Sequence, residues 1–336
     1  MSRRALFMVT VAGTNITAPL LPVLISLTVS DKVGTHADTA TLEIDDTDGC
    51  IVLPQLGAPV IVALGWEGGG VRVVFTGTVD EVRSSGSRSG GRILSISAKG
   101  VDTTGKAKEP QQRHFDDKTV EDILKEAGSG AGIVQVDVDP TLAGITRAYF
   151  EMRDESFIHM GERLAREIGG NFRIQGTTAT MSRRAARYPV SVAAVAGRNL
   201  HAWDIVPALG RAQYGKVRAR WYDTAEAAWK ETEESTSLGA EARHDHRYGR
   251  ASEGEAGDQA AADKATSERD AGEGTVTIEG DTAAIPDGLC TVAGARPGID
   301  GAYRIEAVTH RYSRGGGFVT ELELRQPHQG AGSDWR

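Results

Sequence analysis

The sequence predicts a mainly β protein with a small α+β domain in its middle. Apolar and polar residues alternate along most of the first hundred positions and again near the C-terminus, the pattern of strands with one buried face. The period of about 3.6 residues that is typical of amphipathic helices is concentrated between residues 106 and 187. The C-terminal β pattern also repeats one found about 230 residues earlier, which indicates a duplicated β module.

The two copies have the same order of segments. The C-terminal copy has IPDGLCTVAG at residues 285–294 and YRIEAVTHRYSRGGGFVTELELR at residues 303–325. The earlier copy has LPQLGAPVIVALG at 53–65, VVFTGTVDEV at 73–82, a turn rich in serine and glycine, and RILSISAKG at 92–100. Residues 303–325 predict a hairpin that turns at 313–317, with one buried face that carries Tyr303 and Ile305 and an opposite face that carries Arg304.

The first hundred residues predict a run of short strands with turns rich in Asp, Gly and Ser, as in a sandwich or small barrel. The opening MSRRALFMVTVAG has the charges and apolar run of a secretory leader, but Phe7, Val9 and Val11 alternate with other residues, which favours a first strand. Residues 60–64 are apolar on both faces and predict a central strand.

Two helices are predicted in the middle of the chain. Val120, Ile123, Leu124 and Ala127 share one face of the first, which should stop at Gly128. The second spans DESFIHMGERLAREIGG, where Asp154 or Ser156 can cap the start and two glycines end it. A hairpin should follow, with Phe172 and Ile174 opposite Ala179 and Met181.

These patterns divide the chain into predicted domains. Residues 1–105 form a first β domain, 106–187 the α+β domain, and 188–325 a second β domain, followed by a flexible tail at 326–336. Residues 224–274 interrupt the second β domain with a polar, partly helical insertion that we expect to add no strands. Fourteen acidic and six basic residues lie between Asp223 and Glu273, so this segment alone has a net charge of −8.

Composition excludes several classes of protein. The net charge of −8 and pI of about 5.6 argue against a protein that binds nucleic acid by neutralising phosphates. The two cysteines, Cys50 and Cys290, form no disulfide framework and fit a reducing compartment. No apolar run approaches the ~20 residues that cross a bilayer, so we expect no membrane insertion.

No catalytic motif and no cofactor site is predicted. His244 and His246 resemble a pair of metal ligands, but no further His or Cys lies at ligand spacing, so we assign no metal. The glycines of GSGAGI at 128–133 follow a helix, which indicates a helix end rather than a nucleotide-binding loop. We interpret His159 and His310 as surface residues on a helix and a hairpin.

Six segments in order resemble the late control D family, the tail baseplate hub proteins of contractile-tailed phages, which is related to the N-terminal region of type VI secretion spike proteins. They are ISLTVSDKVGTHADTATLEIDDTDG, LPQLGAPVIVALG, TVEDILKEAG, ESFIHMGERLAREIGGNFRI, IPDGLCTVAG and GAYRIEAVTHRYSRGGGFVTELEL. The resemblance covers nearly the whole chain. No single segment is highly specific, but their order is.

This resemblance implies two tube-type β-barrel domains, and a homotrimer in which six similar barrels form a pseudo-sixfold ring. The ring would join the tail tube to a trimeric spike and contact other baseplate proteins and a tape-measure protein, with DNA only passing through its lumen. It implies a structural protein of the virion tail, assembled in the cytoplasm of a bacterial host. Strands at sheet edges readily pair with other chains, so we predict an assembly surface on the final hairpin, at Tyr303, Ile305, Glu321 and Glu323.

Two other functions stay open at this point. The acidic residues, with His244 and His246, could serve a tail-associated cell-wall hydrolase, and a β module could bind carbohydrate in a receptor-binding protein. The sequence also leaves open whether residues 224–274 face the lumen or the outside of a ring. An insertion of this length fits more easily outside, which favours docking of a basic baseplate partner.

Overall fold

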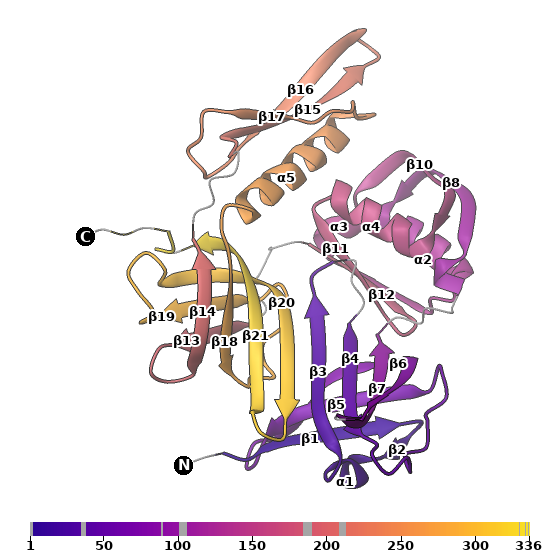
Figure 1. Ribbon diagram of the computed structural model, residues 1–336. Helices are drawn as coiled ribbons and strands as arrows, with labels where there is room; N and C mark the ends of the chain where they lie inside the picture. The colour runs from indigo at the N-terminus through magenta and orange to yellow at the C-terminus, as the bar shows by residue number, and fades with distance from the viewer. Residues whose placement is uncertain are drawn as a thin grey trace.

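The computed structural model describes residues 3–34, 38–88, 90–100, 106–183, 190–207, 213–328, 330–332, 334 and 336. The protein is mainly β, as predicted. Its largest sheet has 13 strands and runs through two β modules that lie side by side, and an α+β unit and a smaller helix-backed sheet pack beside them (Figure 1). Among the described residues, no helix combines the length and the apolar character needed to cross a membrane.

The first module is built from the predicted short strands, and the alternating N-terminal segment is its first strand. Its elements are β1 (Ala5–Val11), β2 (Thr14–Asn15), α1 (Thr17–Leu20), β3 (Leu24–Lys32), β4 (Thr39–Asp45), β5 (Pro59–Trp66), β6 (Gly70–Ser87) and β7 (Gly91–Lys99). The doubly apolar strand β5 pairs with β1 on one side and β6 on the other, so its central position is confirmed.

The second module closes the chain. Its strands are β13 (Ser191–Val195), β14 (Leu200–Val206), β18 (Glu273–Glu279), β19 (Leu289–Ala293), β20 (Gly301–Ser313) and β21 (Gly317–His328). The hairpin β20–β21 turns where predicted. Strand β21 continues to His328, so the start of the predicted flexible tail is wrong.

One half of the hairpin prediction is also wrong. The face of β20 opposite Tyr303 and Ile305 was predicted to be exposed, but Arg304 and Glu306, which lie on it, are both buried. The reason is that other parts of the chain cover that face, since Arg304 pairs with Asp287 and Glu306 lies 3.6 Å from Arg269. Alternation marks one face of a strand as apolar but does not show what covers the other face.

The middle unit contains both predicted helices. Its elements are η1 (Lys106–Lys108), β8 (Pro110–Thr119), α2 (Val120–Gly130), β9 (Gln135–Val138), α3 (Pro140–Ala143), β10 (Thr146–Ser156), α4 (Phe157–Glu167), β11 (Gly170–Gln175) and β12 (Thr178–Arg183). Ser156 caps α4 by accepting a hydrogen bond from the backbone of His159 at 3.3 Å. The predicted hairpin forms with Phe172 opposite Met181.

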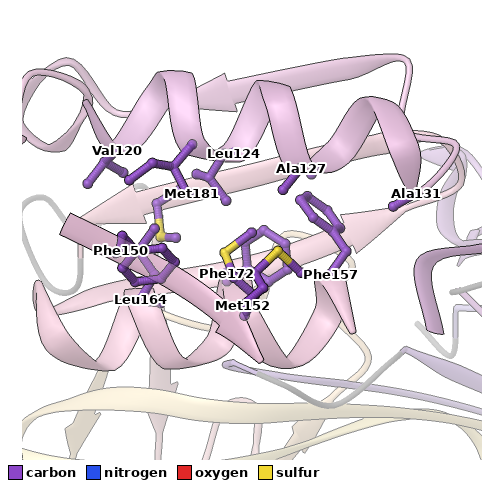
Figure 2. Close-up of a cluster of buried hydrophobic side chains, with 14 of the residues drawn as sticks. Val120, Leu124, Ala127, Ala131, Phe150, Met152, Phe157, Leu164, Phe172 and Met181 are labelled. Atoms are coloured by element: carbon purple, nitrogen blue, oxygen red, sulfur yellow. The ribbon is translucent and has the colours of Figure 1, made fainter. Parts of the chain in front are cut away.

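The apolar faces of α2 and α4 meet over this hairpin. Val120 and Leu124 from α2, Leu164 from α4, and Phe172 and Met181 from the sheet point toward one another (Figure 2). All are nearly inaccessible to solvent, so the middle unit has a hydrophobic core of its own. The predicted domain limits at 105/106 and 187/188 border or fall within segments outside the described residues, and the division into domains stays a prediction.

The acidic insertion differs from its prediction. Together with the preceding strand β15 (Lys216–Asp223), it forms a three-stranded sheet and a helix from β16 (Ala228–Ser235), β17 (Arg243–Asp245) and α5 (Glu253–Arg269), and β15 therefore counts as part of the insertion. The expected helix is present, but the expectation that the segment adds no strands is wrong. Strand β15, which we expected in the second module, pairs only with β16 and β17, because α5 covers its apolar residues Ala219 and Trp221.

Candidate assembly interface

The two β modules have the same order of strands. The first runs β3-β4-β7-β6-β5-β1 and the second runs β14-β18-β21-β20-β19-β13. Four of the five strand pairings correspond in direction, and the fifth differs, because β1 is antiparallel to β5 whereas β13 is parallel to β19. The repeated sequence pattern thus corresponds to a repeated set of paired strands.

Irregularities in the strands repeat as well. A β-bulge lies between Val79 and Glu81 on β6, and another lies between Ile305 and Ala307 on β20. The second bulge follows the first at a spacing of 226 positions along the chain. The corresponding strands β3 and β14 also share a bulge, after Leu24 in β3 and after Leu200 in β14. A bulge changes the twist and direction of a strand, so matching bulges give the two modules matching curvature.

The turns that follow β6 and β20 are built alike. Ser87 Oγ accepts a hydrogen bond from the backbone of Gly90 at 2.9 Å, and Ser313 Oγ accepts one from Gly316 at 3.0 Å. Each turn ends on a glycine with a φ of 70°, a conformation that favours glycine. Arginine follows the serine in both turns, as Arg88 and Arg314.

The two modules are joined edge to edge inside the chain. Strand β20 pairs antiparallel with β3, from Ala307 opposite Lys32 to Ser313 opposite Ser26, and the strands run side by side in Figure 1. Side chains support this internal seam, since Ser30 Oγ and Thr309 Oγ1 lie 3.1 Å apart.

Arg314 locks the end of the internal seam. Its Nη2 atom donates to the carbonyl oxygen of Leu21 at 2.9 Å and also to that of Pro22, both just before β3. A guanidinium carries several donors in a fixed plane and suits such a pair of carbonyl acceptors. The turn of the second module is thereby tied to the first module.

Aromatic side chains at the tip of the β20–β21 hairpin enter the first module. The ring of Tyr312 lies 4.9 Å from that of Phe7, and Phe318 lies 5.7 Å from Trp66. The indole Nε1 of Trp66 donates to the carbonyl of Gly280 at 2.8 Å. Phe318 therefore belongs to the core of the first module although its strand belongs to the second.

The outer edges of the two modules carry no partner strand in the described part of the chain. Strand β14 pairs only with β18, and residues 80–87 of β6 pair only with β7. Arg88 makes no hydrogen bond or ion pair there, and Trp203 on β14 is 45% exposed. Unpaired edges present free backbone donors and acceptors, so these edges could pair with another chain.

The predicted assembly residues lie in two environments. Tyr303 and Ile305 have no exposed surface and belong to the core of the second module, which confirms the buried face predicted for them but makes their assignment to an assembly surface wrong. Glu321 and Glu323 lie on the outer face of β21, 3.3 Å from Arg311 and 3.4 Å from Lys32 respectively. Their role in assembly stays a prediction.

A buried ion pair connects the middle unit to the second module. Arg304 is 1% exposed and pairs with Asp287, which also accepts a hydrogen bond from Asn171 of β11 at 3.1 Å. Asp287 has a φ of 68°, and its backbone donates to Ile305 at 2.8 Å. In the first module Gly57 has the corresponding backbone geometry, with a φ of 79° and a 2.8 Å bond from its backbone N–H to the carbonyl of Val79, so the second module has a carboxylate where the first has glycine.

A second charged cluster lies where β11 meets the first module. Arg173 lies 3.2 Å from Asp31 and also contacts Asp38, beside a groove of 680 Å³. Burial raises the pKa of Asp31 to about 7, although the charge of Arg173 opposes this shift. The cluster holds the middle unit on the first module, and nothing in its geometry indicates a catalytic pair.

His244 and His246 flank a carboxylate that the sequence did not point to. His246 Nδ1 lies 3.0 Å from Asp263 of α5, and His244 Nε2 lies 3.9 Å from the same carboxylate. Among the described residues, no group of three His, Cys, Asp or Glu side chains could hold a metal ion. The two histidines attach β17 to α5.

The two histidines predicted to lie at the surface, His159 and His310, have different environments in the structure. His159 is exposed on α4, as predicted. His310 is buried, so its prediction is wrong, because β3 and the ring of Phe318 cover it. Its Nδ1 lies 2.9 Å from Thr320 Oγ1, and burial lowers its pKa to about 4.

The sequence did not identify Arg88, Arg314 or the edge of β14 as interface elements. A signal was present, because the pattern Ser-Arg-x-Gly-Gly occurs at residues 87–91 and again at 313–317. Aligning the two copies on this turn would have placed the two arginines together.

The family model described as phage tail baseplate hub (GPD) matches residues 39–316. A probable baseplate hub protein of Escherichia phage P2 is 30% identical over 169 residues, which are 50% of this chain and 43% of that protein.

The fold also matches solved structures. A 43 kDa tail protein of a Shewanella oneidensis prophage has a TM-score of 0.71 at 16% identity, over 96% of this chain and 98% of that one. An E. coli component of the type VI secretion system has a TM-score of 0.59 at 11% identity, over 98% of this chain and 79% of that one.

Proposed function

The chain belongs to the phage tail baseplate hub family, and from this premise we propose that three copies form a pseudo-sixfold ring that joins a contractile tail tube to its central spike. The family relatives are baseplate hub proteins, which places the chain in the phage tail and favours a structural over a catalytic role. In this proposal the two modules are tube-type β-barrels.

One observation carries the ring proposal, the duplicated module joined edge to edge within the chain. Two modules with the same strand order, bulges and turns lie side by side. Three such chains arranged around a threefold axis present six similar modules, which suits a junction between sixfold and threefold structures. A chain with one module would place only three modules around the axis and would not match a sixfold tube.

The insertion has exposed aromatic residues that could bind a second protein of the baseplate. Trp229 is 60% exposed and Tyr248 is 66% exposed, and the guanidinium of Arg220 lies 5.3 Å from the ring of Trp229. Aromatic residues and arginine are enriched at protein interfaces. We propose that the small sheet of β15, β16 and β17 faces outward and docks a surrounding baseplate protein.

Mass photometry of the chain with the trimeric spike from the same tail tests the ring. We expect a three-to-three complex, and three hub chains of 35.7 kDa each in the assembled species. An unrelated trimeric protein serves as the control and should leave the hub unassembled. A hub that stays monomeric with its own spike at micromolar concentration would contradict the proposal.

A further inference from the structure

We infer that neighbouring chains are joined by a second copy of the internal seam, in which β14 of one chain pairs with residues 81–87 of β6 in the next. This inference rests on the proposed ring. In the internal seam, β20 of the second module pairs with β3 of the first. The repeat relates β6 to β20 and β14 to β3, so the same pairing between chains would join the edge of β14 to residues 81–87 of β6, and neither has a second partner strand in the described part of the chain.

The internal seam fixes the register of the seam between chains. Residues of β6 and β20 correspond at a spacing of 226 positions, and those of β3 and β14 at a spacing of 176, as the shared bulges show. Thr309 lies opposite Ser30 in the internal seam. The corresponding residues are Arg83 and Val206, which should therefore lie opposite each other between chains.

The same correspondence gives Trp203 a neighbour. In the internal seam Tyr312 lies opposite Leu27, which is fully buried. The corresponding pair between chains is Gly86 opposite Trp203. The indole of Trp203 would fill the space that Gly86, which has no side chain, leaves open opposite it. The turn of the next chain would then cover this indole, which is exposed in the monomer.

Arg88 points to the same contact independently. Its counterpart Arg314 binds the carbonyl oxygens of Leu21 and Pro22. The corresponding carbonyls before β14 belong to Gly197 and Arg198. Arg88 has no partner within the described chain, so it is available to bind these two carbonyls of the next chain and to lock the seam as Arg314 does.

Each contact joins two different surfaces, so the interface is head-to-tail, and in a closed ring of three every β14 edge and every β6 edge has a partner. It is also more polar than the internal seam. Tyr312 and Phe318 insert into the first module, whereas Gly86 and Arg92 occupy the corresponding positions on the β6–β7 hairpin. We therefore expect the internal seam to persist in the monomer and the seam between chains to form on assembly.

Disulfide trapping tests the register. Cys50 is exposed and is replaced by serine in all variants. Arg83→Cys combined with Val206→Cys should give a covalent trimer on non-reducing gels after mild oxidation of the hub–spike complex. Each single variant should give none, and Arg83→Cys with Asp204→Cys, two residues out of register, should give far less.

The chain supplies a positive control. Ser30→Cys with Thr309→Cys places the same pair in the internal seam, where the two oxygens lie 3.1 Å apart, and should form a disulfide within the monomer. If the hub assembles with its spike but the Arg83–Val206 pair stays reduced while this control oxidises, the inferred seam is wrong and the ring stands. If no trimer forms even without substitutions, the ring itself is wrong.

Substitution of Arg88 gives a second readout. Arg88→Ala should keep the melting temperature of the monomer, because the side chain has no partner there, but weaken trimer formation by about tenfold or more. Arg88→Lys should weaken trimer formation less. Arg314→Ala, by contrast, should lower the melting temperature of the monomer. Trimer formation by Arg88→Ala equal to that of the unmodified chain would overturn the role of Arg88.

Discussion

At the scale of single residues, His310 lies where the two modules meet. It is 5% exposed, packs against Phe318 with ring centroids 5.7 Å apart, and contacts the hydroxyl of Thr320. Thr320 Oγ1 accepts a hydrogen bond from the backbone of Asp281 at 2.9 Å, so its own proton can be donated to the neutral imidazole. This arrangement disfavours the imidazolium form, and burial lowers the pKa of His310 to about 4.

The stability of the protein should therefore depend on His310 at acidic pH. A histidine whose folded pKa lies below its unfolded value near 6.5 stabilises the fold above that value, and this contribution is lost as pH falls from 6.5 toward 4. Urea unfolding should show that the free energy of unfolding of the unmodified chain falls between pH 7.5 and pH 4.5. In His310→Gln this fall should be smaller, by up to about 3 kcal/mol.

The matched control for this prediction is His159→Gln, because His159 is exposed on α4. It should keep the pH dependence of the unmodified chain. Burial raises the pKa of Asp31 to about 7, so Asp31 makes the folded state less stable as pH rises toward 7, the opposite direction. Comparison of the variants isolates His310, and an unchanged pH dependence in His310→Gln would contradict the assignment.

At the scale of elements, the acidic insertion is a separate layer attached to the second module. Its strands pair among themselves, and α5 packs on them through Ala256 and Ala260. Its two ends meet, since a Cβ atom placed on Gly272 would lie 2.7 Å from the carbonyl oxygen of Pro207. Beyond this junction it contacts the remaining chain through ion pairs, such as Arg147 with Asp258 at 3.3 Å, and through α5, whose Ala262 packs beside Gly169 at the end of α4.

Replacement of residues 208–271 by a short Gly/Ser linker should therefore leave both modules folded. Strands β14 and β18 stay paired, with Val206 opposite Glu273, and hold the ends of the linker together. We expect the melting temperature in a thermal denaturation experiment to fall by only a few degrees, because loop closure between adjacent ends costs little.

The replacement removes Arg269, which neutralises the buried Glu306. Glu306→Gln in the same variant is therefore the control. It distinguishes stability lost because Glu306 has no ion-pair partner from stability lost because packing contacts are removed. The variant should still form the hub–spike complex and should lose the surrounding baseplate protein. Failure of both versions to fold would show that the insertion is part of the core.

At the scale of the whole molecule, the two modules share a hydrophobic core at one point. Phe318 comes from β21 but is buried among residues of the first module, and it packs beside Trp66. Gly280 makes room for it, since a Cβ atom there would lie 2.2 Å from the phenyl ring. Modules that share both a sheet and a core should unfold together.

Phe318→Ala should test this coupling. Removing a buried phenyl ring destabilises a protein by about 3–5 kcal/mol, and Phe318→Leu, which keeps most of the apolar volume, should cost less. Differential scanning calorimetry should show a single transition in both variants, shifted to lower temperature for the whole chain. Two resolved transitions, of which only one moves, would show that the modules unfold independently.

The sequence by itself determined the local features of this protein. Alternation placed most of the module strands, the stripe of Val120, Ile123 and Leu124 placed α2, and a capping residue at Asp154 or Ser156 marked the start of α4. The repeat was visible because both copies keep the residues that their turns and bulges need. These features depend on neighbours in sequence, so composition and period are sufficient to predict them.

Only the tertiary structure decided which edges meet and which faces are covered. The pairing of β20 with β3 joins residues about 280 positions apart, through backbone groups that every strand possesses, so no local pattern specifies it. The same holds for the burial of Arg304, which depends on Asp287 and Asn171 from other parts of the chain. The edges that we propose to join neighbouring chains are likewise defined by their place in the strand order, although the repeated Ser-Arg-x-Gly-Gly turn already relates Arg88 to Arg314 in the sequence.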